Sequence, residues 1–315
     1  MLLPILLILA SCAFLFLGAE LLVRGGSSLA LKLGLTPLVV GLTVVAYGTS
    51  TPELLVSLKA AFAGNPDIAI GNVVGSNIFN IAVILGLSAL VLPIKTNLQV
   101  LKWDAPLVVL ATLLVPLTFL DGVVSSFEGA CLVLAALLYT WWAIRLARRD
   151  ERLGHEAHVD VPEIRRRPSV VLDLLKIVAG LAVLAFSSRI LVENAVVVAK
   201  IAGLSDTVIG LTIIAAGTSM PELATSMVAA LRGQSDIALG NVLGSSLFNL
   251  FFVLGGAAVV APVSTSGLQI FDLVALAVIT TLMLPFLFTG RSLNRVEGGI
   301  LFLSYLIYLG VMWPK

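Results

Sequence analysis

The sequence predicts an all-α membrane protein with ten transmembrane helices, arranged as two inverted repeats of five helices. Three observations support this fold class. Of the 315 residues, 59% are hydrophobic and 12% are charged, whereas soluble domains average about 25% charged residues. Apolar runs of roughly 20 residues, the length that spans a bilayer as a helix, recur along the chain. The chain also repeats itself at a single offset.

Ten apolar runs are the predicted helices. Each run ends in a short segment of Gly, Pro, polar or charged residues, which is typical of the loops that join membrane-spanning helices. The predicted boundaries are 2–23, 36–62, 68–92, 103–120, 127–146, 169–192, 206–231, 237–261, 268–289 and 296–313.

The repeat relates residues that lie 169 positions apart. At this offset residues 48–90 align with 217–259 without a gap, and 23 of the 43 positions are identical. The chain is therefore predicted to contain two homologous halves and a linker. The predicted parts are a first five-helix repeat at 1–146 with its core at 36–92, a basic linker at 147–168, and a second, inverted repeat at 169–315 with its core at 205–261.

The number of helices in each half predicts the inversion. Because five is odd, the second half must enter the membrane from the opposite side, whereas a sixth helix in either half would remove the inversion. Inverted repeats are the architecture of many secondary transporters, in which the binding site lies near the bilayer midplane between the repeats.

Basic residues predict how the chain crosses the membrane. With the N-terminus outside, 15 of the 19 Lys and Arg residues fall in inner loops or at inner helix ends, as the positive-inside rule requires. We therefore expect a multi-pass protein of the cell (inner) membrane, with both termini outside and the basic linker in the cytoplasm. The lipid bilayer is the expected partner. We expect no nucleic acid, because the linker's charge is explained by topology, and no obligatory protein partner.

Charged residues in the first and sixth predicted helices correspond across the repeat with their signs exchanged. Glu20 and Arg24 align with Arg189 and Glu193. Either pair is spaced for an i,i+4 ion pair within its own helix. The alternative is that these residues hold the ends of two mobile helices through a conformational change.

Two related stretches place an acidic residue inside an apolar run. The stretch "GTSTPELLVS" contains Glu53, and "GTSMPELATS" contains Glu222. Charged residues near the middle of a transmembrane helix usually face an internal cavity or a partner, which makes both glutamates candidate site residues. Pro52 and Pro221 each remove a helical N–H, which predicts a broken helix with a freed carbonyl that can bind a cation. A capping box at a helix start is the alternative for each stretch.

Neutral oxygen ligands recur around both glutamates. The stretches "GNVVGSNIFN" and "GNVLGSSLFN" place a Ser and an Asn four residues apart on one helix face. The candidate side-chain ligands besides the glutamates are Thr49, Ser50, Ser76, Asn80, Thr218, Ser219, Ser245 and Asn249. Carboxylate, hydroxyl and amide oxygens without His or Cys indicate a hard cation, and Ca²⁺ takes about 6–8 such oxygens. Two glutamates balance the charge of one Ca²⁺ or of two Na⁺.

Other small and acidic residues have structural explanations. Small residues four apart let helices approach closely. Two such pairs lie in the third and eighth helices: Gly71, Gly75, Gly240 and Gly244. Asp67 and Asp236 are the expected N-caps of those helices. Glu128 and Glu297 are expected in the first turns of the fifth and tenth helices, where the helix dipole favours an acid.

The motifs "G-T-S-x-P-E" and "G-N-x-x-G-S-x-x-F-N", present in both halves, resemble the α-repeats of the sodium/calcium exchanger family, prokaryotic ten-helix type. The proton/calcium branch of the same superfamily differs, with "G-N-x-x-E" in place of "T-S-x-P-E". The resemblance implies a transporter rather than an enzyme, one that exchanges cytoplasmic Ca²⁺ for external Na⁺ by alternating access. It implies no cofactor besides the transported ions. The first and sixth helices would form a sliding gate.

The resemblance also implies a role for each ligand. Glu53 and Glu222, together with Thr49 and Thr218, would coordinate Ca²⁺. Flanking Na⁺ sites would use four serines and two backbone oxygens, which are those of Ser50, Ser76, Ser219, Ser245, Ala46 and Ala215. Some family members carry Asp at one of the positions that are Asn80 and Asn249 here, so a possible third charge is missing.

Three other functions are weighed against Na⁺/Ca²⁺ exchange. Ca²⁺ or another cation could be exchanged for H⁺ or K⁺, because buried glutamates can also carry protons. An intramembrane metal hydrolase would need a metal-activated water, usually with His ligands, but His155 and His158 both lie in the linker. A cation pore also uses acidic residues, but one glutamate in each inverted half favours alternating access.

Overall fold

The computed structural model describes residues 2–152, 169–203 and 215–312. The protein is a helical membrane protein. Within these ranges eight helices are long and apolar enough to cross a membrane, and a bent pair, Pro37–Thr49 with Thr51–Phe62, makes a ninth candidate span. The helix predicted at 206–231 is described only from residue 215, where it contains the shorter apolar helix Met220–Leu231. The tenth span therefore stays a prediction.

The elements follow one another in a similar order in the two halves. The first half contains α1 (Leu2–Leu33), α2 (Pro37–Val40), η1 (Gly41–Val45), α3 (Ala46–Thr49), α4 (Thr51–Phe62), α5 (Pro66–Phe79), η2 (Asn80–Leu85), α6 (Gly86–Val91), β1 (Ile94–Lys95), η3 (Val100–Asp104), α7 (Ala105–Leu114), η4 (Val115–Phe119), β2 (Val123–Val124) and α8 (Ser126–Arg152). The described part of the second half contains α9 (Val170–Ile201), α11 (Ala215–Thr218), α12 (Met220–Leu231), α13 (Ser235–Phe248), η6 (Asn249–Val253), α14 (Leu254–Val260), β3 (Val263–Ser264), α15 (Ile270–Phe288), η7 (Thr289–Arg291), β4 (Ser292–Leu293) and α16 (Arg295–Met312).

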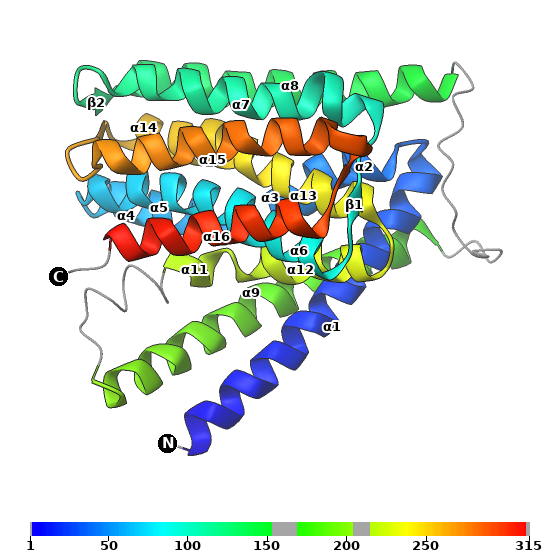
Figure 1. Cartoon of the computed structure of the whole chain (residues 1–315), viewed down its shortest axis with the longest axis horizontal. Coiled ribbons are helices and arrows are strands. Elements are labelled where there is room, and N and C mark those ends of the chain that lie inside the picture. Colours follow the sequence, from blue (N-terminus) through cyan, green and yellow to red (C-terminus); the bar gives the residue numbers. More distant parts are fainter. Residues whose placement is uncertain (1, 153–168, 204–214, 313–315) are drawn as a thin grey trace.

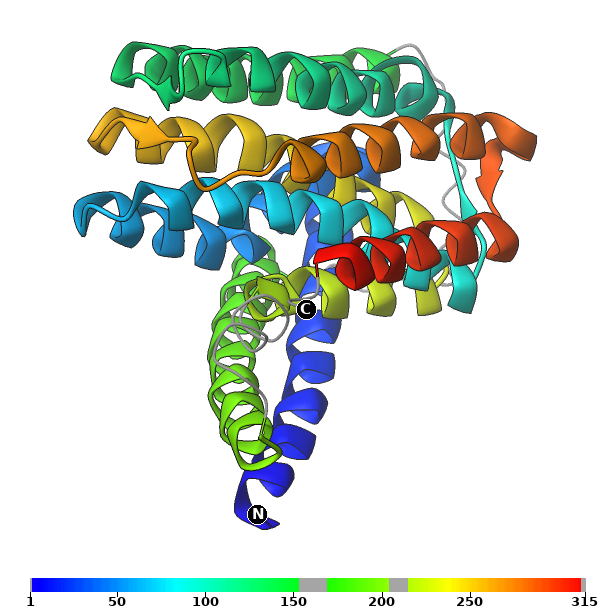
Figure 2. The same ribbon diagram turned by 60° about the vertical axis from the view of Figure 1, so that its left-hand side comes forward.

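Helices α1 and α9 lie side by side and project from the bundle of the other helices (Figures 1 and 2). Their close approach depends on glycines, among them Gly18 and Gly180. A Cβ atom on Gly18 would lie 3.0 Å from the carbonyl oxygen of Gly180, and one on Gly180 would lie 2.8 Å from that of Gly18. Larger residues at these positions would separate the two helices.

Both long helices run past their predicted ends at residues 23 and 192. The charged residues that suggested those ends are paired, so the helix can continue through them. Arg24 forms an ion pair with Glu20 at 2.5 Å, and Lys32 forms one with Asp173 of α9. The predicted pair of Arg189 and Glu193 is also present, at 2.7 Å, but it is local and exposed. At the other end of the first half, α8 continues to Arg152, six residues into the predicted linker, whose residues 153–168 lie outside the described ranges.

The ion pair of Glu20 with Arg24 also includes a residue outside α1. Glu20 also accepts from Arg232, which follows α12, with 2.5 Å between Arg232 Nη2 and Glu20 Oε1. The nearby Ser27 hydroxyl donates to Gln234 Oε1 at 2.9 Å. These contacts fix α1 to the turn between α12 and α13.

The bundle joins the two halves through contacts that recur at the offset of 169. Strand β1 pairs with β4, and β2 pairs with β3, all antiparallel. A Cβ atom on Gly86 would lie 2.9 Å from the carbonyl oxygen of Gly298, and one on Gly255 would lie 2.7 Å from that of Gly129. The offset relates Gly86 to Gly255 and Gly129 to Gly298, so each contact is the counterpart of the other with the halves exchanged.

The predicted first-turn acids are confirmed, but a predicted cap is wrong. Glu128 accepts from the Ser125 backbone N–H at 2.8 Å, and Glu297 accepts from that of Asn294 at 2.9 Å. Asp236 does not cap α13, because α13 begins at Ser235 and its N-cap is Gln234. The Asp236 carboxylate instead accepts from Asn97 at 3.0 Å, a contact between distant segments that the local sequence did not reveal. The side chain of Asp67 lies outside the described residues.

Candidate functional site

Two broken helices supply the central residues of the candidate site. The first breaks at Ser50, between α3 and α4, with a bend of 45°. The second breaks at Ser219, between α11 and α12. Both serines adopt φ near −85° and ψ near 10° (−82°, 8° and −89°, 10°), a sparsely populated region in which many active-site residues are found. A proline follows two residues after each break, as predicted, and is the second residue of the next helix, where no N–H partner is needed.

The two glutamates lie in the first turns of the helices that follow the breaks. Glu53 is the third residue of α4 and is 1% exposed, and Glu222 is the third residue of α12 and is 0% exposed. A helix N-terminus carries a partial positive charge, which stabilises a carboxylate placed there. Both predicted acids are therefore buried at the start of a helix.

Hydrogen bonds between the halves join each glutamate to the serine at the other break. The Ser50 hydroxyl donates to Glu222 Oε1 at 2.8 Å, and the Ser219 hydroxyl donates to Glu53 Oε1 at 2.8 Å. Neither serine makes a side-chain cap to its own helix. The alternative of a local capping box is therefore wrong, because the serine hydroxyls face the opposite repeat.

The threonines beside the breaks have different partners. Thr49 Oγ1 donates either to Asn241 Oδ1, at 3.2 Å, or to the carbonyl oxygen of Ala46, at 3.3 Å. Ser245 also reaches the Ala46 carbonyl, at 3.5 Å. Thr218 Oγ1 is buried and has no hydrogen-bond partner among the described residues. For Ala215 only the backbone can be described, and it begins α11.

The predicted amide ligands occupy wide helical turns. Asn80 begins the π-helical segment η2, and Asn249 begins η6. Such turns are rare and occur frequently at functional sites. Helix α12, which carries Glu222, contacts η2, and α4, which carries Glu53, contacts η6. Each asparagine therefore begins a turn that packs against the glutamate helix of the opposite half.

Unsatisfied polar atoms concentrate in the predicted site. Among the described residues, thirteen buried side-chain polar atoms lack a hydrogen-bond partner, and eight of them belong to predicted ligands. The eight are one carboxylate oxygen of Glu53, one of Glu222, the hydroxyls of Ser76 and Thr218, and both amide atoms of Asn80 and Asn249. Buried polar groups are normally paired, so such a cluster indicates a site that binds a polar or charged ligand.

Two residues beside the predicted ligands were missed. The amide nitrogen of Asn72 donates to the backbone carbonyl of Glu53 at 3.1 Å, and that of Asn241 donates to the carbonyl of Glu222 at 3.2 Å. Each amide also donates at 2.9 Å to a serine one turn further along the glutamate helix, Ser57 or Ser226. Both asparagines belong to the repeated "G-N" pair that begins the second motif, so the identity between the halves was the available signal.

Glycines bring one helix of the second half against the first broken helix. A Cβ atom on Gly240 would lie 2.6 Å from the carbonyl oxygen of Leu38, and one on Gly244 would lie 2.5 Å from that of Leu42. The predicted close approach is therefore confirmed for this pair. At Gly71 and Gly75 no described atom lies within 4 Å of such a Cβ, so the prediction for them stays untested.

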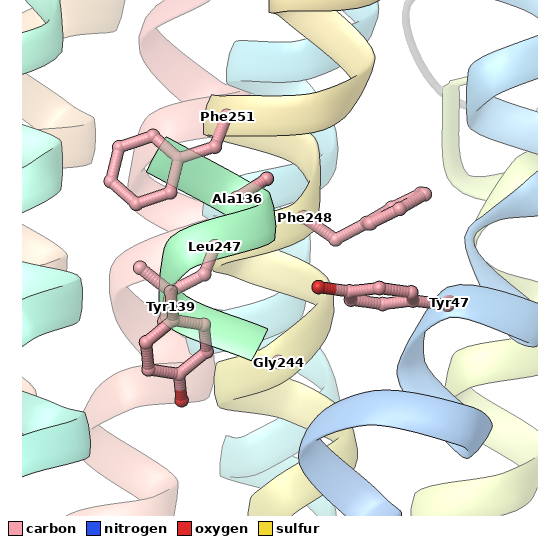
Figure 3. Close-up of a pocket in the computed structure, with 7 residues that line it drawn as sticks. All are labelled: Tyr47, Ala136, Tyr139, Gly244, Leu247, Phe248 and Phe251. Atoms are coloured by element: carbon pink, nitrogen blue, oxygen red, sulfur yellow. The ribbon is translucent and has the colours of Figure 1, made fainter. Parts of the chain in front are cut away.

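A small apolar pocket adjoins Gly244, and none of the predicted ligands lines it (Figure 3). Its lining comes from α3, α8, α13 and η6: Tyr47, Ala136, Tyr139, Gly244, Leu247, Phe248 and Phe251. The Tyr47 hydroxyl is hydrogen-bonded to Thr140 of α8, and its ring lies 4.3 Å from that of Phe248 between centroids. These aromatic contacts support the helix that carries Ala46 and Thr49, and the pocket offers little to a cation.

The donor set restricts the kind of ligand. No group of three or more His, Cys, Asp or Glu side chains placed to hold a metal occurs in the described ranges. The site instead combines two carboxylates with hydroxyl, amide and carbonyl oxygens, which suit a hard cation such as Ca²⁺ or Na⁺.

Fold and site together define a multi-pass helical membrane protein with a buried, oxygen-lined polar centre formed by two broken helices. The chain belongs to the sodium/calcium exchanger protein family, whose sequence model matches residues 3–145 and 173–313.

Individual proteins resemble the chain over nearly its whole length. It is 32% identical to the sodium/calcium exchanger MaX1 of Methanosarcina acetivorans, over 98% of each chain. It is 37% identical to the inner membrane protein YrbG of Escherichia coli, over 83% of this chain and 81% of that one. The structure matches that of the sodium-calcium exchanger NCX_Mj soaked with Na⁺ and Ca²⁺, with a TM-score of 0.84, 27% identity and complete coverage of both chains.

Proposed function

We propose that this chain is a secondary active transporter that exchanges Ca²⁺ for Na⁺ across the membrane by alternating access. The observation that carries the proposal is the buried pair of glutamates, each with one carboxylate oxygen that lacks a partner among the described residues. Burying two unpaired carboxylates is costly, and a cation bound between them would remove that cost. Family membership and the names of the relatives support Na⁺ and Ca²⁺ as the ions.

Each predicted ligand has a role in this proposal. Glu53 and Glu222 bind Ca²⁺ together with Thr49 and Thr218. The flanking Na⁺ sites are formed by the hydroxyls of Ser50, Ser76, Ser219 and Ser245, the amides of Asn80 and Asn249, and the carbonyls of Ala46 and Ala215. Because two carboxylates neutralise either one Ca²⁺ or two Na⁺, the two ions compete for the same charge and bind in turn. No cofactor is needed besides the transported ions.

The proposed architecture is ten transmembrane helices in two inverted five-helix repeats, 1–146 and 169–315. Contacts that recur at the offset of 169, such as the strand pairs and the glycine contacts, support two equivalent halves. We place the protein in the inner membrane, with both termini outside and the linker in the cytoplasm, from the distribution of Lys and Arg.

Helices α1 and α9 are the proposed moving pair. They project from the bundle (Figure 2) and contact it partly through polar groups, such as Glu20 with Arg232 and Ser188 with the Gly217 carbonyl, the latter at 2.6 Å. Polar contacts of this kind can be exchanged during sliding more readily than an interdigitated apolar core. Sliding of the pair would open the oxygen-lined centre to one side of the membrane at a time.

The proposal is tested by reconstituting the purified protein in liposomes and imposing gradients of Na⁺, K⁺ and H⁺ one at a time. We expect Ca²⁺ uptake that requires the Na⁺ gradient, saturates with Ca²⁺ and stops when the gradient is dissipated. Uptake driven by the H⁺ or K⁺ gradient alone would instead establish the alternative exchange. Flux that needs no counter-ion and does not saturate would indicate a pore and would contradict alternating access.

A further inference from the structure

The amide of Asn241 has only one orientation that satisfies its neighbours. It lies against the backbone carbonyl of Glu222, at 3.2 Å, and a carbonyl can only accept a hydrogen bond. The amide NH₂ group must therefore face Glu222, and Oδ1 must face the other way. There it lies 3.2 Å from the hydroxyl of Thr49, which belongs to the other half of the chain.

This orientation offers the Thr49 proton an acceptor in the other half of the chain. An amide oxygen can only accept, so Asn241 Oδ1 is an acceptor for the single proton of the Thr49 hydroxyl, and it is the nearer of the two acceptors that Thr49 reaches. Both lone pairs of Thr49 Oγ1 are then available to a cation. One competing acceptor is the Ala46 carbonyl, at 3.3 Å. The Ala46 oxygen already accepts from the backbone N–H of Ser50 at 3.0 Å and is reached by Ser245 at 3.5 Å. The amide of Asn241 thus prepares one oxygen of the first half, that of Thr49.

The equivalent threonine of the second half lacks such a partner. Thr218 Oγ1 is buried and makes no hydrogen bond within the described residues, although Asn72 binds the Glu53 carbonyl as Asn241 binds that of Glu222. The support of a glutamate carbonyl by an asparagine is therefore common to both halves, whereas the support of a threonine hydroxyl occurs in one. Asn241 therefore has one role that Asn72 shares, the support of a glutamate carbonyl, and one that Asn72 lacks among its described contacts, the acceptance of a threonine proton.

We propose that Asn241 is a positioning residue for cation binding, which accepts the Thr49 proton and thereby directs the hydroxyl oxygen of Thr49 toward the cation. The inference rests on the proposed function, since it assigns a role within the same site. Asn241 does not itself touch the cation. It acts through Thr49, so its effect on cation affinity requires the Thr49 hydroxyl.

The test is a double-mutant cycle on the full-length protein, with Asn241→Leu, Thr49→Val and the double variant. Calcium affinity is measured by titration calorimetry in detergent, and Na⁺-driven Ca²⁺ uptake in liposomes. Each single variant is expected to weaken Ca²⁺ affinity about tenfold, the effect of losing one hydrogen bond to a charged or cation-bound group. The double variant is expected to be no weaker than the single ones, because both remove the same oriented hydroxyl.

Asn72→Leu supplies the matched control. Asn72 makes the same kind of bond to a glutamate carbonyl, but its described contacts do not include Thr49. Asn72→Leu and Thr49→Val should therefore combine additively. Additive effects of Asn241→Leu and Thr49→Val would overturn the proposal, because they would mean that Asn241 acts only through the backbone of α12. Should Asn241→Leu fail to fold, Asn241→Ala takes its place in the cycle.

Wild-type measurements separate this inference from the proposed function. If the wild-type protein neither binds Ca²⁺ nor takes it up in a Na⁺ gradient, both the proposed function and the role of Asn241 are wrong. If the wild-type protein exchanges the ions but the cycle is additive, only the role of Asn241 is wrong. The Thr49→Ser variant, which keeps the hydroxyl, is expected to retain affinity near that of the wild type, and loss of affinity in it would also count against the hydroxyl's role.

Discussion

Glu53 and Glu222 show how a few neighbouring residues make a buried carboxylate tolerable. A proline precedes each glutamate in the first turn of a helix, so the carboxylate lies at a helix N-terminus, which favours negative charge. A serine from the opposite half donates to one oxygen of each carboxylate. The remaining oxygens have no partner among the described residues. Each carboxylate is thus stabilised in its charged form, and one of its two oxygens still lacks a hydrogen-bond donor or a cation.

Replacing Glu53 by Gln should abolish exchange while leaving the protein folded. The amide has nearly the shape of the carboxylate but carries no charge, so the site can no longer neutralise Ca²⁺. We expect exchange to fall at least about 100-fold, beyond the effect typical of changes outside the ligand shell. Calcium should raise the melting temperature of the wild type but not of Glu53→Gln, because only a bound ligand stabilises the folded state. Thermal unfolding with and without Ca²⁺ measures this.

Glu128→Gln is the control for that substitution. Glu128, like Glu53, is the third residue of its helix, and Gln can replace Glu in the capping box that Glu128 forms with Ser125. Exchange and the stabilisation by Ca²⁺ should both stay near wild-type levels. If the two variants behaved alike, a helix-start role would account for Glu53, and the cation site would lose its main support.

At the scale of elements, the first broken helix is held in place by α13. The glycines of α13 allow its backbone to touch that of α2 and η1, and the Ser245 hydroxyl and Asn241 amide then reach the residues of α3. Close backbone contact is available only to small residues. The position of Ala46 and Thr49 therefore depends in part on Gly240, Gly244 and Asn241, which do not themselves contact the proposed cation.

Gly244→Ala should therefore weaken both packing and cation binding. The new Cβ would lie 2.5 Å from the Leu42 carbonyl oxygen, a backbone atom that cannot turn away. We expect a loss of about 1–3 kcal/mol in stability, typical of overpacking, together with a lower apparent Ca²⁺ affinity as α3 shifts. Unfolding in denaturant and calorimetric titration measure the two effects.

Gly310→Ala is the matched change at an exposed position of α16. No described atom lies within 4 Å of its added Cβ, and Ala is a better helix former than Gly. The stability and affinity of this variant should be unchanged or slightly improved. An equal loss in both variants would show that the close contact at Gly244 is not the cause.

At the scale of the molecule, the two halves are interlocked rather than adjacent. Strands, glycine contacts and the serine–glutamate bonds all join one half to the other. Neither half contains a complete site, because each glutamate receives its serine from the other half. A polar centre built in this way responds to any movement of one half relative to the other, which is the property that alternating access requires.

Much of this arrangement could be predicted from the sequence, because it depends on local chemistry that occurs twice. The buried glutamates, the prolines at the breaks and the first-turn acids Glu128 and Glu297 follow from residue type and position. The long end of α1 did not, because Lys32 is paired with Asp173, 141 residues away.

Differences between the two halves could not be predicted from the sequence either. Thr49 and Thr218 occupy identical motifs, yet only Thr49 reaches the asparagine of the opposite half. Repeated motifs predict equal roles, whereas the conformation in which each half is held depends on the packing of the whole molecule.

The measurement that tests the central claim most directly is the anomalous scattering of crystals of the wild-type protein soaked with Ca²⁺. We expect one Ca²⁺ peak bound by carboxylate oxygens of both Glu53 and Glu222, at the 2.3–2.6 Å typical of this ion (about 2.4 Å). Addition of Na⁺ should reduce that peak. A Ca²⁺ ion bound elsewhere, or one that contacts a single glutamate and is unaffected by Na⁺, would contradict a shared site at which the two ions compete.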